Sequence, residues 1–447
     1  AGRTKDARRT RKAVLRKMVL PGFGCDFLHR IPYNVGMKDT ALYEEILGLK
    51  KPWHVTKVDL SMESQEVVIH VEAEETAWGC PTCSRRMHVH EWTTRRWRHL
   101  DTCQLRTVIE AKVPRVKCPE HGTLMVTVPW AEPYGRFTAM FEQVAIMLMQ
   151  HCSTSAAARH LHLSWDETDH IKERAVKRGL ERRVPVPARA VCIDEKSVGK
   201  GHDYVTIVTR VPHEGAPFVD FIADGREQSA LDAYWKLEST GPLERIGCAS
   251  MDMWRPFINS ASAALPQGEQ AITHDPFHIV QHMNQAVDRV RRQEQPLLDT
   301  AARQELKGTR FMWLYGFENL PAKWTERMAA MKDGKTRTAR AWRLKEIFRS
   351  FYECENWAQA EAFFKNWYSA AMRSRLDPIK KVARMIKDHL PQVLNYFIHR
   401  VTNAFSEGMN SRIQGLIKQA NGYRNRERLK RDLYFHLENL DMLPIVQ

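Results

Sequence analysis

Three acidic residues stand where a chain can place carboxylates for metal-dependent chemistry. Asp194 and Asp252 each follow a short apolar run that predicts a buried strand, and Glu407 lies in a helix expected over residues 401–421. A buried carboxylate costs several kcal/mol unless a cation or hydrogen bonds compensate it. Taken alone, Asp194 is more simply interpreted as a solvated acid at the start of a hairpin. Its functional interpretation therefore depends on the other two acids.

The helix expected over residues 401–421 has two different faces at about 100° per residue. One face is broad and apolar, and the second carries small residues at positions 404, 408, 411 and 415. A face of small side chains lets a helix lie very close to another element. Glu407 borders this face, so the helix could bring its carboxylate to the end of a strand.

Asp194, Asp252 and Glu407 would repel one another at a single point unless divalent cations lay between them. Carboxylate oxygens are the hard ligands that Mg²⁺ prefers, with Mn²⁺ as the alternative ion. Two such ions about 4 Å apart stabilise the attacking and leaving oxygens of a phosphodiester. The three acids therefore predict a two-metal site that cuts nucleic acid.

A second group of residues has the spacing of a zinc site. Cys80 and Cys83 form a CxxC pair, and Cys118 and His121 form a CxxH pair further along the chain. Three thiolates and one imidazole suit a closed, structural, tetrahedral zinc site, with unliganded cysteines in a β-domain as the alternative. Cys103 has no such partner and is interpreted as a core thiol.

Two stretches have the basic character of DNA-binding segments. Arg95, Arg96 and Arg98 lie among aromatic residues between the two zinc pairs. Residues 138–180 are expected to form three helices with a short turn before the third, as in a helix-turn-helix, although any three-helix bundle can imitate this pattern. The third helix would begin near Ser164, and its basic residues predict further DNA contacts at Lys172 and Arg174.

The composition supports a polyanionic partner. The chain of 447 residues has a formal net charge of +15 and a pI of about 9.4, and such an excess favours nucleic acid. No apolar run reaches the about 18 residues of a membrane span, and the basic N-terminus lacks the apolar core of a secretory signal. Nine cysteines, an odd number, indicate reduced thiols. We therefore expect a cytoplasmic protein that does not contact membranes.

The order of expected elements predicts a multidomain α+β protein. After residue 186, three consecutive strands precede alternating helices and strands, which is the order of a ribonuclease H-like α/β fold, and residues 295–398 contain no convincing strand. The predicted parts are a basic arm or non-native leader (1–36), a zinc-ribbon domain (37–130), a helix-turn-helix (131–185), a catalytic domain (186–294), an all-α insertion (295–398) and the end of the catalytic domain (399–447).

Five stretches of the sequence together resemble one family. They are VKCPEHG, CIDEKSVGKGHDYVTIV, SMDMWRPF, DPFHIV and SEGMNSRIQGLIKQANGYRNRERL. From about Met37 onwards, the chain resembles bacterial insertion-sequence transposases of the DDE class, specifically the ISL-three family. The resemblance implies that Asp194, Asp252 and Glu407 are the catalytic triad.

The resemblance also implies roles for other residues and for partners. Asp275 and His278 would be auxiliary residues near the active site, and Asn410, Lys418 and Arg424 would contact the DNA backbone. The zinc ribbon and helix-turn-helix would bind the terminal inverted repeats of a mobile element. The metal site would cut a strand, expose a 3′-OH and join it to target DNA. A homodimer or larger synaptic complex, associated with the bacterial nucleoid, would hold both ends.

Two other functions remain open on the sequence. A DNA-binding regulator derived from a transposase would use the zinc ribbon and helix-turn-helix without catalysis. A ribonuclease H-like nuclease would hydrolyse DNA without joining it. The presence of all three acids favours a catalytic protein over the regulator, and the end-binding domains favour a transposase over the nuclease.

Overall fold

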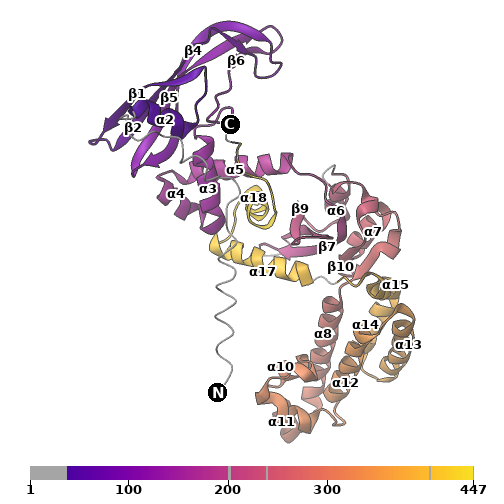
Figure 1. Ribbon diagram of the computed structural model, residues 1–447. Coiled ribbons are helices and arrows are strands. Elements are labelled where there is room, and N and C mark those ends of the chain that lie inside the picture. The colour runs from indigo at the N-terminus through magenta and orange to yellow at the C-terminus, as the bar shows by residue number, and fades with distance from the viewer. Residues whose placement is uncertain (1–37, 200–202, 238–239, 402–403, 446–447) are drawn as a thin grey trace, which may run out of the picture. The chain divides into compact units, whose positions relative to one another are not determined.

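The computed structural model describes residues 38–199, 203–237, 240–401 and 404–445 (Figure 1). The arm or leader predicted over residues 1–36 lies outside them. The described residues form two compact units, one of residues up to Phe141 with Ile445, the other of Glu142–Pro444. Each unit has its own sheet and its own core, as the predicted multidomain fold requires.

The first unit is a β-domain built around one long hairpin. Its sheet has the order β1-β2-β5-β4-β3, with β6 paired to β5. The predicted hairpin over residues 53–74 is confirmed as β1 and β2, which pair antiparallel. The elements of this unit are α2 (Asp39–Leu47), β1 (Trp53–Ser61), β2 (Glu66–Ala73), β3 (Ala77–Gly79), β4 (Arg86–Thr102), β5 (Leu105–Cys118) and β6 (Gly122–Met125).

Tryptophans form the centre of the core of this first unit. The ring of Trp130 lies edge-on to Trp53 and Trp97, with ring centroids 5.0 and 5.5 Å apart. Cys103 does not join this core. It is exposed, with φ of 51°, at the turn between β4 and β5. The prediction of a core thiol was therefore wrong, because Cys103 supplies a left-handed turn position rather than a strand position.

Three helices in the expected places precede the second sheet. They are α3 (Ala139–His151), α4 (Thr154–Leu161) and α5 (Trp165–Glu181). The hydroxyl of Ser153 accepts a hydrogen bond from the Ala156 N–H and caps α4. Ser164 and Glu167 form a reciprocal capping box at the start of α5, so the third helix begins where the sequence predicted.

The second unit contains the sheet on which the acidic residues lie. Strands β7 (Ala188–Ser197), β8 (Tyr204–Pro212) and β9 (Phe218–Asp224) form an antiparallel meander. Strands β10 (Ala249–Met251) and β11 (Ile272–His274) continue the sheet in parallel on the other side of β7, in the order β11-β10-β7-β8-β9. This arrangement matches the predicted ribonuclease H-like order.

Helices cover both faces of this sheet because its strands are apolar on both sides. Helices α6 (Gln228–Trp235) and α7 (Arg255–Ala264) pack on the face that includes Val191 and Ile193. Helices α17 (Ala404–Gln419) and α18 (Arg426–Leu437) pack on the opposite face, which includes Val205 and Ile207. Helix α17 ends two residues before the end of the predicted span of residues 401–421, Val401 is not helical, and α18 was not predicted.

A helical region lies between β11 and α17, as predicted. It starts with the long helix α8 (Pro276–Glu294) and buries Trp313, Trp342 and Trp367 in its core. These three tryptophans are core residues, as expected, whereas Trp357 is partly exposed. The other helices are α9 (Thr300–Leu306), α10 (Arg310–Leu314), α11 (Ala322–Met331), α12 (Arg337–Arg349), α13 (Trp357–Arg373), α14 (Asp377–Asp388), α15 (Leu390–Leu394) and α16 (Tyr396–His399).

Candidate active site and DNA-binding surfaces

The two aspartates occupy neighbouring positions on two parallel strands. Asp252 directly follows the last residue of β10, whereas the strand predicted before Asp194 continues through it, so Asp194 lies inside β7, three residues before its end at Ser197. Met251 at the end of β10 pairs with Ile193 of β7, so the next residues along the two strands are Asp252 and Asp194. Adjacent strands are about 4.8 Å apart, and their carboxyl ends point to the same edge of the sheet. This register brings together two acids that are 58 residues apart in the sequence (252 − 194).

The carboxylate of Asp194 is held by two hydrogen bonds. Oδ1 accepts from the Glu195 N–H at 2.8 Å, and Oδ2 accepts from the side-chain amide of Asn410 at 2.6 Å. Burial raises the pKa of Asp194, and the negative charge of Asp252 raises it further, while His278 and the two hydrogen bonds act in the opposite direction. The carboxylate is thus oriented and only partly neutralised by protein groups.

His278 lies between two of the acids. Its Nδ1 is 3.8 Å from Asp252 Oδ2, and its Nε2 is 3.9 Å from Asp275 Oδ2. Asp275 is buried just after β11, and His278 follows one turn later in α8. The structure therefore places both predicted auxiliary residues close to Asp252, at distances longer than a hydrogen bond. The Asp252 carboxylate itself accepts a hydrogen bond from the Met253 N–H at 2.6 Å.

Helix α17 runs along the same end of the sheet. Asn410 bonds to Asp194, and the backbone of Glu407 lies one turn earlier in the same helix. The Glu407 side chain lies outside the described part of the structure. Residues three apart on a helix share a face, so Glu407 occupies a position on the side of α17 that faces β7. Asn410, predicted as a DNA contact, instead orients a candidate catalytic carboxylate.

A further ion pair beside Asp194 was not predicted. Glu195 pairs with Arg226 at 3.3 Å, and the Arg226 guanidinium also lies over the rings of Tyr204 and Trp254. This stacking fixes an arginine next to the acidic residues of β7. No local sequence pattern pointed to it, because Arg226 lies in the turn before α6.

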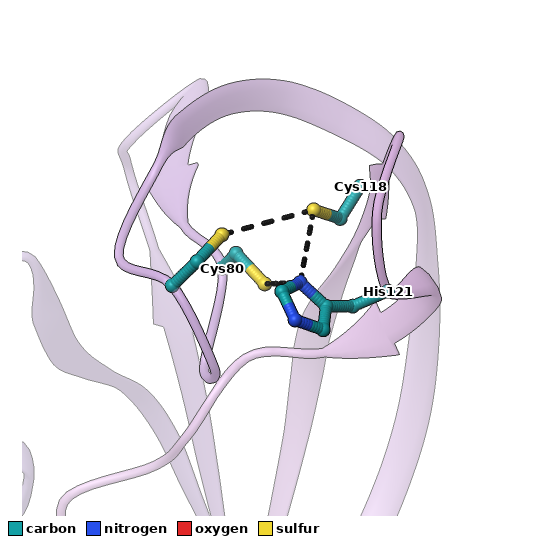
Figure 2. Close-up of side chains that lie close together, drawn as sticks. Cys80, Cys118 and His121 are labelled. Atoms are coloured by element: carbon teal, nitrogen blue, oxygen red, sulfur yellow. Dashed lines mark hydrogen bonds between the residues drawn. The ribbon is translucent and has the colours of Figure 1, made fainter.

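The predicted zinc ligands converge in the first unit. The ligand atoms of Cys80, Cys83, Cys118 and His121 all lie within 4.8 Å of one another. Figure 2 shows the sulfur atoms of Cys80 and Cys118 directed at the His121 imidazole, with distances to Nδ1 of 3.9 and 3.4 Å. Within the described ranges, no other group of three or more such side chains converges this closely.

The distances in this cluster fit a tetrahedral zinc ion. With Zn–S bonds of about 2.3 Å, tetrahedral geometry places two sulfur atoms about 3.8 Å apart, and Cys83 Sγ lies 3.8 Å from Cys118 Sγ. Three thiolates and one imidazole fill all four positions, so the site supports a structural zinc ion and leaves no position for substrate.

The three arginines predicted as DNA contacts in the zinc ribbon differ in their exposure to solvent. Arg96 is exposed but forms ion pairs with Glu66 and Glu110, and Arg95 is partly buried over the Trp97 ring. Arg98 is 7 % exposed and its guanidinium bonds to backbone carbonyls and to Asp101. Its burial contradicts the predicted DNA contact.

The two residues of α5 predicted as DNA contacts also bond to other groups of the protein. Lys172 is 2 % exposed, and its amino group bonds to Thr154 at 2.7 Å and Asp432 at 2.8 Å. Arg174 forms an ion pair with Glu142 at 2.5 Å. The burial of Lys172 contradicts its predicted role as a DNA contact, and its partner Asp432 is too distant in sequence to have been foreseen.

A hollow of about 750 Å³ lies between the start of α5 and the turn that joins α17 to α18. The predicted DNA contact Arg424 is exposed in its wall, near Trp165 and Arg428. The guanidinium of Arg428 lies 4.6 Å from the Trp165 ring centroid. Lys418 is exposed at the end of α17, outside the hollow.

Two neighbouring acids on a ribonuclease H-like sheet, together with a zinc ribbon and a helix-turn-helix, are typical of enzymes that act on DNA. Residues 191–433, more than half of the chain, match the transposase family of the ISL3 type. Residues 76–121 match the zinc finger of the IS204, IS1001, IS1096 and IS1165 transposases, and residues 126–169 match the helix-turn-helix domain of transposase family ISL3. The chain belongs to the ISL3 family of insertion-sequence transposases.

Two relatives agree with this assignment over most of their length. The chain is 26% identical over 353 residues to the transposase for insertion sequence element IS1001 of Bordetella parapertussis, covering 78% of this chain and 86% of the relative. It is 25% identical over 425 residues to the transposase for insertion sequence element IS1557 of Mycobacterium tuberculosis, covering 88% and 94%. In the described residues, no helix is both long and apolar enough to span a membrane.

Proposed function

We propose that this transposase cuts and joins DNA strands at a site formed by Asp194, Asp252 and Glu407. The observation that carries the proposal is the register of β7 and β10, which places two acids at one sheet edge. Helix α17 reaches the same edge through the hydrogen bond from Asn410 to Asp194. A third carboxylate at position 407, one turn from Asn410, would complete the oxygen ligands of a divalent metal site.

The residues at this edge fit magnesium. Asp194 and Asp252 present hard carboxylate oxygens, and the pKa of Asp194 is raised by burial and by its acidic neighbour, an arrangement that a divalent cation would stabilise. Asp194, Asp252 and Glu407 would hold the ions, which supply charge stabilisation for the attacking and leaving oxygens of the phosphodiester. Hydrogen bonds from Asn410 to Asp194 and from the Met253 N–H to Asp252 orient the two aspartates, and His278 lies close to Asp252.

The DNA partners in this proposal are the terminal inverted repeats of the element and the target DNA. The zinc ribbon and helix-turn-helix would bind the repeats. Arg424 and Lys418 are exposed basic residues close to the turn after α17 and can bind phosphates there. Two ends must be joined to one target, so a homodimer or larger synaptic complex would carry out the reaction.

The test is cleavage and joining of a duplex that carries the element end, with Mg²⁺, by the full chain. Asp252→Asn and Glu407→Gln keep side-chain shape but remove one ligand charge each, so both should bind DNA. We expect cleavage to fall by at least about 100-fold, the typical loss on removing one group that stabilises transition-state charge. Asp333→Asn is the matched control, because Asp333 is exposed in a loop of the helical region, and it should cut normally.

Other outcomes would assign another function. Full activity of both site variants would show that the active site lies elsewhere. Binding without cleavage by the wild-type chain would indicate a regulator derived from a transposase. Cleavage without any joined product would indicate a nuclease.

A further inference from the structure

Helix α8 carries a polar and basic stripe that starts at the candidate active site. Counting about 100° per residue, six residues fall within an arc of about 100°, and the buried residues Met283, Val287 and Val290 lie on the opposite side. From the active-site end onwards, the stripe consists of His278, Gln281, His282, Gln285, Arg289 and Arg292. At about 1.5 Å per residue it is about 21 Å long.

The stripe forms a ridge between two hollows. Gln285 and Arg289 line both of them. The first hollow, of about 370 Å³, extends to Arg310 of α10. The second, of about 240 Å³, extends to Lys381 and Met385 of α14. Helices of the insertion therefore form the walls on both sides of the ridge.

The charge of this surface is positive. Its one acidic lining residue, Asp288, is mostly buried and lies close to the guanidinium groups of Arg291, Arg292 and Arg310, at 2.8, 3.4 and 3.5 Å. Arg289 and Lys381 are exposed, and neither forms an ion pair within the described residues. Three arginines around one carboxylate, together with two cations lacking an acidic partner, leave an excess of positive charge.

We propose that this ridge binds the backbone of the DNA segment that leaves the active site. The inference rests on the proposed function for its starting point at His278, which lies 3.8 Å from Asp252. Arginine and lysine side chains bind phosphates through charge, and glutamine amides donate hydrogen bonds to them, without reading sequence. The helical insertion thus has a role in DNA binding in addition to its own packed core.

The salt dependence of DNA binding tests the charge of the ridge. The probe is a duplex with one inverted repeat of the element and the adjoining flanking DNA, assayed without added Mg²⁺. For R289Q/K381Q, the slope of log affinity against log salt should fall by about 1.8, or about 0.9 for each phosphate that the variant no longer neutralises. Arg373→Gln is the matched control, because Arg373 is exposed on α13 outside both hollows, and its slope should stay that of the wild type.

Photo-crosslinking tests the direction of the DNA. A crosslinking amino acid at Gln281, Gln285 or Arg292 should react with nucleotides that lie progressively further from the junction between repeat and flank. The distance from residue 281 to residue 292 is about 16 Å, or about five base pairs along a duplex. The same amino acid at Arg373 should give no DNA crosslink.

The outcomes separate this inference from the proposed function. Unchanged salt slopes for R289Q/K381Q, or crosslinks no stronger than those from position 373, would overturn the DNA ridge even if the wild type cuts DNA. Ordered crosslinks from a wild-type chain that never cuts would support the ridge and refute the proposed catalysis. Loss of crosslinks on adding an acidic protein competitor but not on adding duplex competitor would assign the surface to a protein and overturn the inference.

Discussion

Replacing Lys172 with methionine should destabilise the packing of α18 against α5. The amino group of Lys172 is buried and bonds to Asp432 and Thr154, and it also lies 5.3 Å from the Phe435 ring centroid. Removing one partner of a buried ion pair costs about 3–5 kcal/mol. We expect about 3 kcal/mol, because Asp432 keeps its hydrogen bond from Tyr423 at 2.6 Å.

Hydrogen exchange of the α18 amides measures this change locally. If the free energy of opening of α18 falls by about 3 kcal/mol, its amides should exchange roughly 100-fold faster. The double variant K172M/D432N should recover part of the loss, since no unpaired carboxylate remains at position 432. The difference between the stability loss of the double variant and the sum of the two single losses gives the interaction free energy of the Lys172–Asp432 pair.

The salt dependence of DNA binding distinguishes a structural role of Lys172 from a role in contacting DNA. A lysine that binds a phosphate contributes about 0.9 to the salt slope, whereas a lysine buried against Asp432 contributes nothing to it. K172M should therefore leave the slope unchanged. A fall of about 0.9, with unchanged exchange in α18, would show that Lys172 binds DNA and would refute its structural role.

Three further predictions follow from the sites described. Cys83→Ser should abolish the one equivalent of bound zinc measured by elemental analysis, whereas Cys103→Ser should retain it, because Cys103 is exposed at a turn. Asn410→Leu removes a hydrogen bond that lowers the pKa of Asp194. In a plot of cleavage rate against pH, the fall in rate at acidic pH should therefore begin at a higher pH than in the wild type, and an unchanged profile would contradict this role. Burial lowers the pKa of His274 to about 4, so the unfolded chain binds a proton that the folded chain does not. Stability should then fall as pH drops from 6.5 towards 4, by up to about 3 kcal/mol, and urea titrations of His274→Asn should show a shallower fall.

The parts of the fold that were predicted correctly depend on local patterns. The CxxC and CxxH pairs bring two ligands each, and the hairpin over residues 53–74 joins neighbours in sequence. The apolar runs before Asp194 and Asp252 identified β7 and β10, although β7 continues three residues beyond Asp194 to Ser197. Parallel pairing then brings Asp194 and Asp252 to one edge.

The wrong predictions concern residues whose contacts lie far away in the sequence or in irregular segments. Strand alternation would place Arg96 and Arg98 on the same exposed face, but the backbone of Arg98 pairs with residues 136–138, and its guanidinium lies 5.2 Å from the ring centroid of Phe141, which follows that segment. Helix α18 did carry a signal, because Leu429, Leu433 and Leu437 repeat every four residues after the cap at Asn425.

The C-terminal helices connect the catalytic sheet with the helix-turn-helix. On α17, Asn410 holds Asp194, and the backbone of Glu407 lies one turn away. On α18, Asp432 holds Lys172, and Arg431 forms an ion pair with Asp169 at 2.5 Å. One short turn joins α17 and α18, so these two helices link the sheet to α5 through the contacts of Asn410 and Asp432. The Lys172 variant therefore also tests this connection: weaker packing of α18 should reduce cleavage more than it reduces DNA affinity.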